Sequence, residues 1–369
     1  MNTLTTTTTG FNQKTVFIFD TTEGMTLSKD VIDSKGHLIA SKDTVLDSNL
    51  ISRIAGYHIL EVSIYDMPAS LISLSEESVT YYQNIKQSTA FINFKNQYME
   101  NVSQVKDHLN NFVLNNAPLN PSALISGPVS ILSKYKNNLQ LFDMLHCIRE
   151  FDDSTYIHCI NVSLIASIIG KWMNFSEKDV ETITLCGLLH DIGKLEIPPE
   201  ILTKPGRLTD NEYAIMKNHV NLGYSKLNNQ KVLTSVKEAC LLHHEKCDGS
   251  GYPFGLHSNK IPDFTKIITI ADIYDAMTAN RVYRDAICPF EVIQAMETDA
   301  FTKYDPRFML PFLKHVVDSY MHNTVRLSDG RLGTVVLINN DALSRPVVQC
   351  KDEFVNLSKE RDIKIVAII

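Results

Sequence analysis

The chain has 369 residues, of which 44% are hydrophobic and 21% charged, and its formal net charge at pH 7 is -7. This length allows about two or three domains with a sizeable core, while the acidic balance argues against a general nucleic-acid coat and gives no sign of membrane-surface binding. The seven cysteines are scattered without a C-x-x-C pair, which argues against a disulfide framework and a cysteine zinc site and favours a reducing, cytoplasmic location.

The first part of the chain is expected to be rich in strands. "MNTLTTTTTG" lacks the basic start and long apolar core of a signal peptide. Residues 15–66 contain short β-branched runs, and "DSKG" supplies the residues of a hairpin turn. Between these runs, "LDSNLISRIAG" predicts a short helix that begins near Asp47 or Ser48 and ends at Gly56.

The rest of the chain changes pattern twice. Residues 75–115 are polar with a helical pattern, and the proline-containing "NNAPLNPSALISGP" predicts a linker up to about residue 129, so we expect residues 1–129 to form a small α+β accessory or regulatory domain. Residues 130–322 are almost entirely helical, and their most apolar helix is broken by Lys171 and too short to span a membrane. Residues 323–369 predict a short β module, with two strands around a Ser-Asp-Gly turn and a final strand. The predicted fold class is mainly α.

Four predicted helices of the central region carry histidine on their apolar stripe: His158, the His190–Asp191 pair, His219, and the His243–His244 pair. A single such histidine is usually a satisfied core residue, because one ring needs only one or two hydrogen bonds. Four helices with the same feature indicate a metal centre, in which neutral imidazoles are ligands and carboxylates balance the charge. Ser176 predicts the N-cap of the second helix, and Thr209 with Glu212 predicts a capping box before the third.

Two further charged residues are expected near this centre. Asp272 lies among isoleucines in "KIITIADIYDAM", so it is either a capping or salt-bridged aspartate or a second carboxylate ligand. Lys194 follows His190 by four residues, and a continuous helix places both on one face. An ammonium group beside metal ions is tolerable there if an anion joins it, and a phosphodiester is such an anion. A solvent-facing lysine is the alternative.

These residues resemble the HD superfamily of metal-dependent phosphohydrolases. The order H…HD…H…HH…D and the motifs "HDIGK", "HHEKCDGSGYP" and "IADIYDAMTANRVYR" are similar to those of its HD-GYP branch, whose known members are mostly cyclic di-GMP phosphodiesterases. The resemblance runs from about Asp152 to Phe312. It implies that residues 130–322 form an HD-type helical bundle as the catalytic domain.

The resemblance implies a site for two divalent ions with these ligands: His158, His190, Asp191, His219, His243, His244 and Asp272. Asp191 would bridge the ions. Imidazole and carboxylate ligands without thiolate suit iron or manganese, with zinc as an alternative. Three-metal members carry a glutamate four residues before the first histidine, where this chain has Ser154, with Asp153 beside it, so two metals are favoured over three.

The resemblance also implies contacts with the substrate: Lys194 at the scissile phosphate, the loop residues Gly251, Tyr252 and Pro253, and the basic pair Arg281 and Arg284. Gly249 and Gly251 permit positive φ and close backbone approach, while proline stiffens the turn. Tyr252 is expected either to stack on a base of the substrate or to pack the loop against the helices that carry the predicted metal ligands. From the residues alone, the loop is typical of a connector and the arginines of a solvated helix face.

The predicted function is metal-dependent hydrolysis of cyclic di-GMP to linear pGpG, GMP or both, in bacterial second-messenger signalling. Asp191 and Lys194 are the predicted catalytic residues. Two alternatives stay open: an HD phosphohydrolase for another cyclic dinucleotide or nucleotide, and a non-catalytic scaffold that binds a cyclic dinucleotide. The expected partner is cyclic di-GMP or a related cyclic dinucleotide, not a nucleic-acid polymer or a membrane. A homodimer or a signalling-protein partner is also left open.

Overall fold

The computed structural model describes residues 12–17, 21, 25–32, 38–42, 44–46, 50–51, 54, 59, 61–66, 85–135, 138–148, 155–204, 206–278, 288–351 and 353–369. The chain divides into two compact units, Met1–Ser78 and Val79–Ile369.

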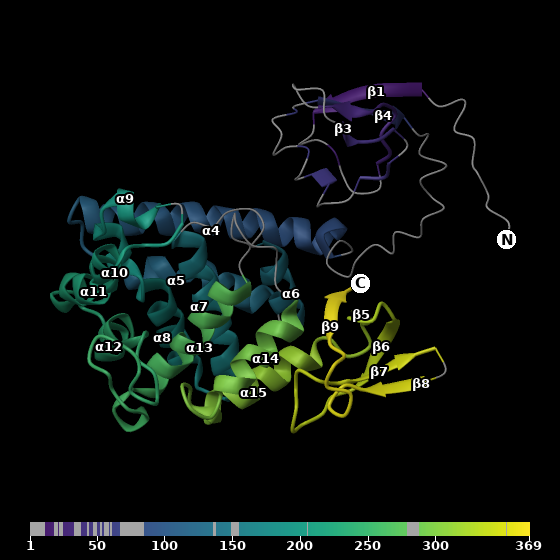
Figure 1. Ribbon diagram of the computed structural model, residues 1–369. Coiled ribbons are helices and arrows are strands. Elements are labelled where there is room, and N and C mark those ends of the chain that lie inside the picture. The colour runs from purple at the N-terminus through teal and green to yellow at the C-terminus, as the bar shows by residue number, and fades with distance from the viewer. Residues whose placement is uncertain are drawn as a thin grey trace. The chain divides into compact units, whose positions relative to one another are not determined.

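The first unit is built on short antiparallel strand pairs (Figure 1). Strand β1 (Asn12–Phe17) pairs with β4 (Glu61–Asp66), and β2 (Val31–Ile32) pairs with β3 (Leu38–Ala40). Its small core contains Leu27, Leu46, Ile54 and Ile64. The strand-rich pattern predicted for this part is therefore confirmed, and Leu50, Ile51 and Ile54 are helical within the predicted short helix.

The second unit is mainly helical, as predicted (Figure 1). Its helices in chain order are α4 (Thr89–Leu114), α5 (Pro121–Lys134), α6 (Asn138–Ile148), α7 (Thr155–Trp172), α8 (Glu177–Leu189), the 3-10 helix η2 (Ile192–Glu196), α9 (Pro199–Leu202), α10 (Asp210–Lys217), α11 (His219–Asn228), α12 (Thr234–Leu242), the 3-10 helix η3 (Ser258–Lys260), α13 (Asp263–Thr278), α14 (Pro289–Asp299) and α15 (Pro306–Asp318). Ser176 accepts a hydrogen bond from the Asp179 N–H at the start of α8, which confirms the predicted N-cap.

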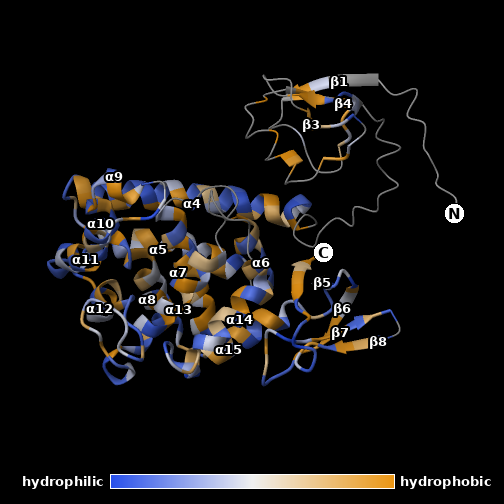
Figure 2. Ribbon diagram, viewed as in Figure 1, coloured by the Kyte–Doolittle hydropathy of each residue, from blue (hydrophilic) through white to orange (hydrophobic). Residues whose placement is uncertain are grey.

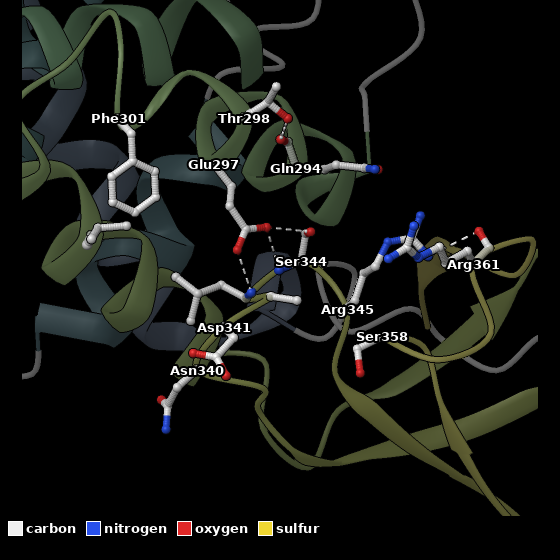
Figure 3. Close-up of a pocket in the computed structure, with 13 residues that line it drawn as sticks. Gln294, Glu297, Thr298, Phe301, Asn340, Asp341, Ser344, Arg345, Ser358 and Arg361 are labelled. Atoms are coloured by element: carbon white, nitrogen blue, oxygen red, sulfur yellow. Dashed lines mark hydrogen bonds between the residues drawn. The ribbon is translucent and has the colours of Figure 1, made fainter.

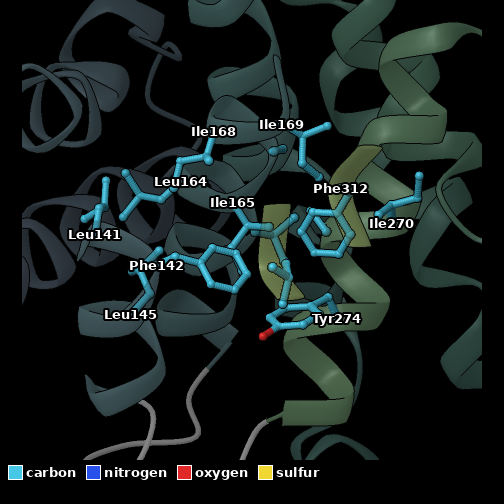
Figure 4. Close-up of a cluster of buried hydrophobic side chains, with 14 of the residues drawn as sticks. Leu141, Phe142, Leu145, Leu164, Ile165, Ile168, Ile169, Ile270, Tyr274 and Phe312 are labelled. Carbon is cyan, nitrogen blue, oxygen red and sulfur yellow. The ribbon is translucent and has the colours of Figure 1, made fainter. Parts of the chain in front are cut away.

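Helix α7 forms the centre of this unit. It is buried on nearly every side, which explains its continuous apolar sequence, and the orange interior of the bundle in Figure 2 follows the same pattern. Ile165 packs within a cluster to which α6 contributes Phe142, α13 contributes Tyr274 and α15 contributes Phe312 (Figure 4). The rings of Phe142 and Tyr274 have centroids 5.1 Å apart. Among the described helices, none has the length and apolar composition that a membrane crossing requires.

The linker expected before residue 129 is wrong from Pro121 onward, because α5 begins there. Asn120 caps this helix by accepting a hydrogen bond from the Ala123 N–H. Proline is well suited to the first helical position, where its missing N–H needs no partner, and Pro128 lies inside the helix. Both α4 and α5 belong to the unit that begins at Val79, so this division differs from the predicted boundary near residue 129.

The C-terminal β module is a five-stranded antiparallel sheet with the order β8-β7-β6-β5-β9. Its strands are β5 (Thr324–Leu327), β6 (Leu332–Leu337), β7 (Val347–Cys350), β8 (Glu353–Asn356) and β9 (Ile365–Ile368). The predicted strands around the Ser-Asp-Gly turn and at the end of the chain are confirmed. Val325, Leu327 and Ile365 share one core with the helices, so the module is part of the second unit.

Lys266 of α13 and Asp305, which precedes α15, form an ion pair inside this unit. Lys266 Nζ lies 2.9 Å from Asp305 Oδ2, and both side chains are only 7% exposed. Burial raises the pKa of Asp305, but hydrogen bonds from Arg307 and Lys266 outweigh burial and hold it well below its ordinary value of 3.8. The stabilisation by this carboxylate is therefore present above that ordinary value and is lost as the pH falls through the lower pKa of the folded state.

We expect Asp305→Ala to lower the free energy of unfolding by about 3–5 kcal/mol, because buried Lys266 would lose its close partner. It would keep only Asp263, a largely exposed carboxylate whose Oδ1 lies 3.9 Å from Lys266 Nζ. The matched control is Asp263→Ala, since Asp263 also pairs with Arg307 but its side chain is 48% exposed. That change should cost about 1 kcal/mol or less. Urea denaturation followed by circular dichroism measures both variants, and equal losses would contradict the role of burial.

Candidate metal centre

The structure brings all seven predicted metal ligands together from helices that are far apart in the sequence. Their possible ligand atoms form two groups, and the atoms of each group lie within 4.8 Å of one another. One group contains Asp191, His219, His243 and His244, and the other contains His158, His190 and Asp272. The clusters are able to hold divalent metal ions.

Asp191 lies between the two groups and is fully buried. Its Oδ1 lies 3.3 Å from His219 Nε2 and 3.5 Å from His243 Nε2. Its Oδ2 lies 3.4 Å from His158 Nε2 and 3.3 Å from His190 Nε2. One carboxylate thus presents a different oxygen to each group, which is the arrangement required of a carboxylate shared by two cations.

Two buried polar atoms at this centre, His190 Nε2 and Asp191 Oδ1, have no hydrogen-bond partner among the described residues. Leaving such an atom unsatisfied costs about 1–3 kcal/mol, and a bound ion or an ordered water can remove this cost. Imidazole nitrogen and carboxylate oxygen are both ligands of divalent transition metals. The residues present therefore fit a metal centre.

Hydrogen bonds at Nδ1, on the side that faces away from the centre, fix the orientation of several imidazole rings. Nδ1 of His190 and Nδ1 of His219 each lie 2.7 Å from the carbonyl oxygen three residues earlier. Nδ1 of His158 lies 2.8 Å from Asp275 Oδ2. Because these acceptors require an N–H at Nδ1, the lone pair of each neutral ring is at Nε2, which faces the centre.

Asp275 is a residue that the sequence analysis missed. It is 3% exposed and lies three residues after Asp272 on α13. Positions three apart lie on neighbouring parts of one helix face, and a second carboxylate inside an apolar helix needs a polar partner. This spacing was the signal that could have identified Asp275 as the residue that orients His158.

Burial and nearby carboxylates set the protonation of the histidines. Burial lowers the pKa of His243 to about 4 and that of His244 to about 2, so both rings are neutral at pH 7, the form that binds metals. Burial also acts to lower the pKa of His158, but hydrogen bonds with Asp272 and Asp275 raise it to about 10. These carboxylates therefore attract positive charge to the centre, as they would attract a metal cation.

The chain turns more sharply at the centre than a continuous helix would. Helix α8 ends just before His190, and Asp191 is the N-cap of the 3-10 helix η2. Gly193 of η2 lies against the start of α11, where a Cβ would be 1.9 Å from the carbonyl oxygen of His219. Only glycine permits this approach, which brings the two short segments together and places Asp191 next to His219.

The predicted single helix around His219 is two helices, α10 and α11, which meet at Asn218. The capping box of Thr209 and Glu212 at the start of α10 is present, as predicted. His219 is the first residue of α11, and Ile215 of α10 is 44% exposed rather than part of a shared buried stripe. At this break, His219 Nδ1 lies within hydrogen-bond distance of the Met216 carbonyl oxygen in the last turn of α10.

Lys194 lies at the centre but already has an anionic partner. Its Nζ is 2.6 Å from Asp191 Oδ2, and its side chain is 24% exposed. Burial opposes the charge of Lys194, but the attraction of Asp191 and Asp272 raises its pKa above the usual value. The ammonium group does not require a phosphate for neutralisation, so its contact with a substrate stays a prediction.

The loop that contains Gly251, Tyr252 and Pro253 packs on the centre. Gly249 has a φ of +82°, and a Cβ on Gly251 would lie 2.5 Å from the His244 carbonyl oxygen, so both predicted reasons for glycine are confirmed. Tyr252 stacks on His244, with ring centroids 4.7 Å apart and 26° between the planes. Of the two predicted roles of Tyr252, the structure shows the packing of the loop against the predicted metal ligands. Pro253 follows through a cis peptide bond.

Glu245 forms hydrogen bonds that hold this loop in place. It is a second residue that the sequence analysis missed. It directly follows the histidine pair and is 1% exposed. Its Oε1 accepts a hydrogen bond from the Phe254 N–H at 2.7 Å, and its Oε2 accepts one from the Leu256 N–H at 2.8 Å. A buried carboxylate with two backbone donors holds the far end of the loop against the histidine pair.

We expect Glu245→Ala to destabilise the folded loop by about 2 kcal/mol or more, because two partly buried N–H groups lose a charged acceptor. Hydrogen exchange of the Phe254 and Leu256 amides should become faster. Glu200→Ala is the control, since Glu200 is exposed and its replacement should change stability by about 0.5 kcal/mol at most. Unchanged exchange at both amides in Glu245→Ala would show that the loop is held by other contacts.

The remaining predicted residues, Arg281, Arg284, Asp153 and Ser154, lie outside the described residues.

Comparison with known protein families bears directly on this centre. Residues 132–308 match the family model of the HD domain, and the matched range contains all seven residues of the two groups. This part of the chain is an HD domain. The family predicted from the sequence is thereby confirmed, and so is the mainly α fold class.

The HD domain has relatives among well-described proteins. A cyclic di-GMP phosphodiesterase of Pseudomonas aeruginosa is 34% identical over 203 residues, which are 55% of this chain and 49% of that protein. A cyclic di-GMP phosphodiesterase of Thermotoga maritima is 37% identical over 178 residues, 47% of this chain and 48% of that protein. A 3′3′-cGAMP-specific phosphodiesterase of Vibrio cholerae is 32% identical over 177 residues, 47% of this chain and 34% of that protein. The chain spans about half the length of the first two relatives.

A solved HDG"Y"P protein from Bdellovibrio bacteriovorus superposes with a TM-score of 0.49 at 14% sequence identity, covering 82% of this chain and 98% of that chain.

Proposed function

We propose that the HD domain is a metal-dependent phosphodiesterase that hydrolyses cyclic di-GMP to linear pGpG, GMP or both. The observation that carries this proposal is the position of Asp191, whose Oδ1 faces His219 and whose Oδ2 faces His190. Relatives named as cyclic di-GMP phosphodiesterases support the choice of substrate. A relative specific for 3′3′-cGAMP keeps another cyclic dinucleotide as the alternative.

The two groups of ligands would each hold one divalent ion, with Asp191 shared between them. Iron or manganese suits this set of imidazoles and carboxylates, with zinc as the alternative. When bound, such a pair supplies an activated water near neutral pH and neutralises charge on a phosphate. A third ion is not favoured, because Ser154 stands where three-metal relatives have a glutamate.

The chain's own side chains would prepare the site for a phosphodiester. Lys194 is partly exposed and bonded to Asp191, so its ammonium group can transfer this contact to a phosphate oxygen and stabilise charge that develops there. Tyr252 covers one side of His244 and restricts the access of water to that ring. Asp275 keeps the proton of His158 on Nδ1, which leaves Nε2 as the ligand atom.

The test is incubation of the full chain, loaded anaerobically with Fe²⁺ or Mn²⁺, with cyclic di-GMP, 3′3′-cGAMP, cyclic di-AMP and a simple phosphate monoester. We expect conversion of cyclic di-GMP to linear products, which chromatography separates. Hydrolysis of only another compound would favour a different HD phosphohydrolase activity. Binding of cyclic di-GMP without hydrolysis of any compound, in protein that contains its metals, would favour the non-catalytic scaffold.

A further inference from the structure

A cavity of about 680 Å³ lies between the end of α14, α15 and the C-terminal β module (Figure 3). This volume falls within the range of about 300–1,000 Å³ that is common for small-molecule sites. None of the residues that line it belongs to the two groups of metal ligands. The cavity is therefore a second candidate site, separate from the proposed hydrolysis.

Glu297 of α14 holds the wall of this cavity in place. One carboxylate oxygen accepts a hydrogen bond from the Leu343 N–H at 2.7 Å. The other accepts hydrogen bonds from the Ser344 N–H at 3.3 Å and the Ser344 hydroxyl at 2.7 Å. Three donors to one carboxylate fix the loop before β7 on α14 and also offset the negative charge of Glu297. The cavity is thus formed before any ligand enters.

One end of the cavity carries two arginines. Arg345 NH1 donates to the carbonyl oxygens of Leu357 at 3.2 Å, Arg361 at 3.2 Å and Ile363 at 3.4 Å. These acceptors fix the guanidinium group but carry no charge. Within the described part of the chain, neither Arg345 nor Arg361 forms an ion pair with a carboxylate, whereas Arg331 of the same module pairs with Asp329. Such guanidinium groups bind phosphate or carboxylate through parallel hydrogen bonds.

The other end of the cavity carries an aromatic ring. Phe301, just after α14, is 71% exposed and lines the cavity with Leu310. Figure 3 shows Phe301 at the end opposite Arg345 and Arg361, with Asn340 and Asp341 below it on the same side. An exposed ring stacks on a planar ligand, and the amide and carboxylate are hydrogen-bonding partners for its edge.

We propose that this cavity binds a nucleoside phosphate, with its phosphate at Arg345 and Arg361 and its base on Phe301. The separation of cationic and aromatic ends favours a ligand that joins an anion to a planar ring over an anion alone. Since Glu297 connects the cavity wall to α14, a bound ligand would add contacts between the β module and the helical bundle.

The test measures GMP binding to the full chain by isothermal titration calorimetry, with guanosine and inorganic phosphate as partial ligands. We expect GMP to bind at least about tenfold more tightly than either, because each partial ligand lacks one contact. Arg361→Gln and Phe301→Ala should each weaken GMP binding by about tenfold. The controls are Arg326→Gln, an exposed arginine on β5, and Phe354→Ala, whose ring on β8 is 67% exposed; both should bind GMP normally.

These variants also separate the cavity from the metal centre, where GMP could bind as a product. All four leave the seven metal ligands unchanged, so binding at that centre would be equal in every protein. Equal GMP affinity in all variants, or no GMP binding, would overturn the proposal. Equal affinity for GMP and inorganic phosphate, without an effect of Phe301→Ala, would reduce the cavity to an anion site and overturn the assignment to a nucleoside phosphate.

Discussion

Replacing Asp191 with alanine is expected to remove both metal ions and to lower turnover of cyclic di-GMP by a factor on the order of 10³ or more. The reason is geometric, since Oδ1 and Oδ2 of this one carboxylate face different groups of histidines. Burial raises the pKa of Asp191, but Lys194 and the neighbouring histidines hold it well below its ordinary value. The substitution therefore removes a negative charge at any pH at which the protein is assayed. Elemental analysis of anaerobically purified protein and a turnover assay measure the two effects.

The matched control is Glu181→Ala, which removes an exposed carboxylate from α8, the helix that leads to the centre. It should keep the metal content and turnover of the unchanged protein. Asp191→Asn tests the charge separately, because the amide preserves the shape of the side chain. If a folded Asp191→Ala protein kept two metal ions, Asp191 would not be the shared ligand.

Replacing Lys194 with alanine is expected to leave the metal content intact and to lower turnover by about 10²-fold or more, the usual effect of losing one charge contact to a transition state. The affinity for substrate should fall less than turnover if the contact strengthens as charge develops on the phosphate. The ion pair that Lys194 forms with Asp191 in this structure indicates an alternative role for the lysine. If the ammonium group serves only to neutralise this carboxylate, its loss should change metal affinity instead.

Lys178→Ala is the control for this experiment, since Lys178 is an exposed lysine of α8. Metal content, turnover and the concentration of substrate at half-maximal rate are measured for both variants. Normal turnover in Lys194→Ala, or loss of its metal ions, would make Lys194 a structural residue.

The convergence of the seven predicted metal ligands could be anticipated because most of them lie on an apolar stripe, although the stripe predicted around His219 is broken at Asn218. His158 and Asp272 are examples, since both lie within long helices whose pattern is regular. The exact ends of the helices could not be predicted in the same way. The turn at Asp191 depends on the approach of Gly193 to His219, a contact between segments that sequence periodicity does not contain.

The residues that support the predicted ligands were harder to recognise. Asp275 acts through His158, and Glu245 through the N–H groups of Phe254 and Leu256. Each role depends on a partner distant in the sequence or on the path of a loop. The helix at Pro121 was missed for a different reason, because prolines that are typical of a linker also suit a helix start.

The central claim is that one centre of this chain holds two metal ions with Asp191 between them. The most direct test is a crystal structure of Mn²⁺-loaded protein with anomalous scattering data. We predict two anomalous peaks about 3.5–4 Å apart, one beside Asp191 Oδ1 with His219, and the other beside Asp191 Oδ2 with His158. A single peak, or peaks that leave either histidine without a metal ion, would contradict the claim.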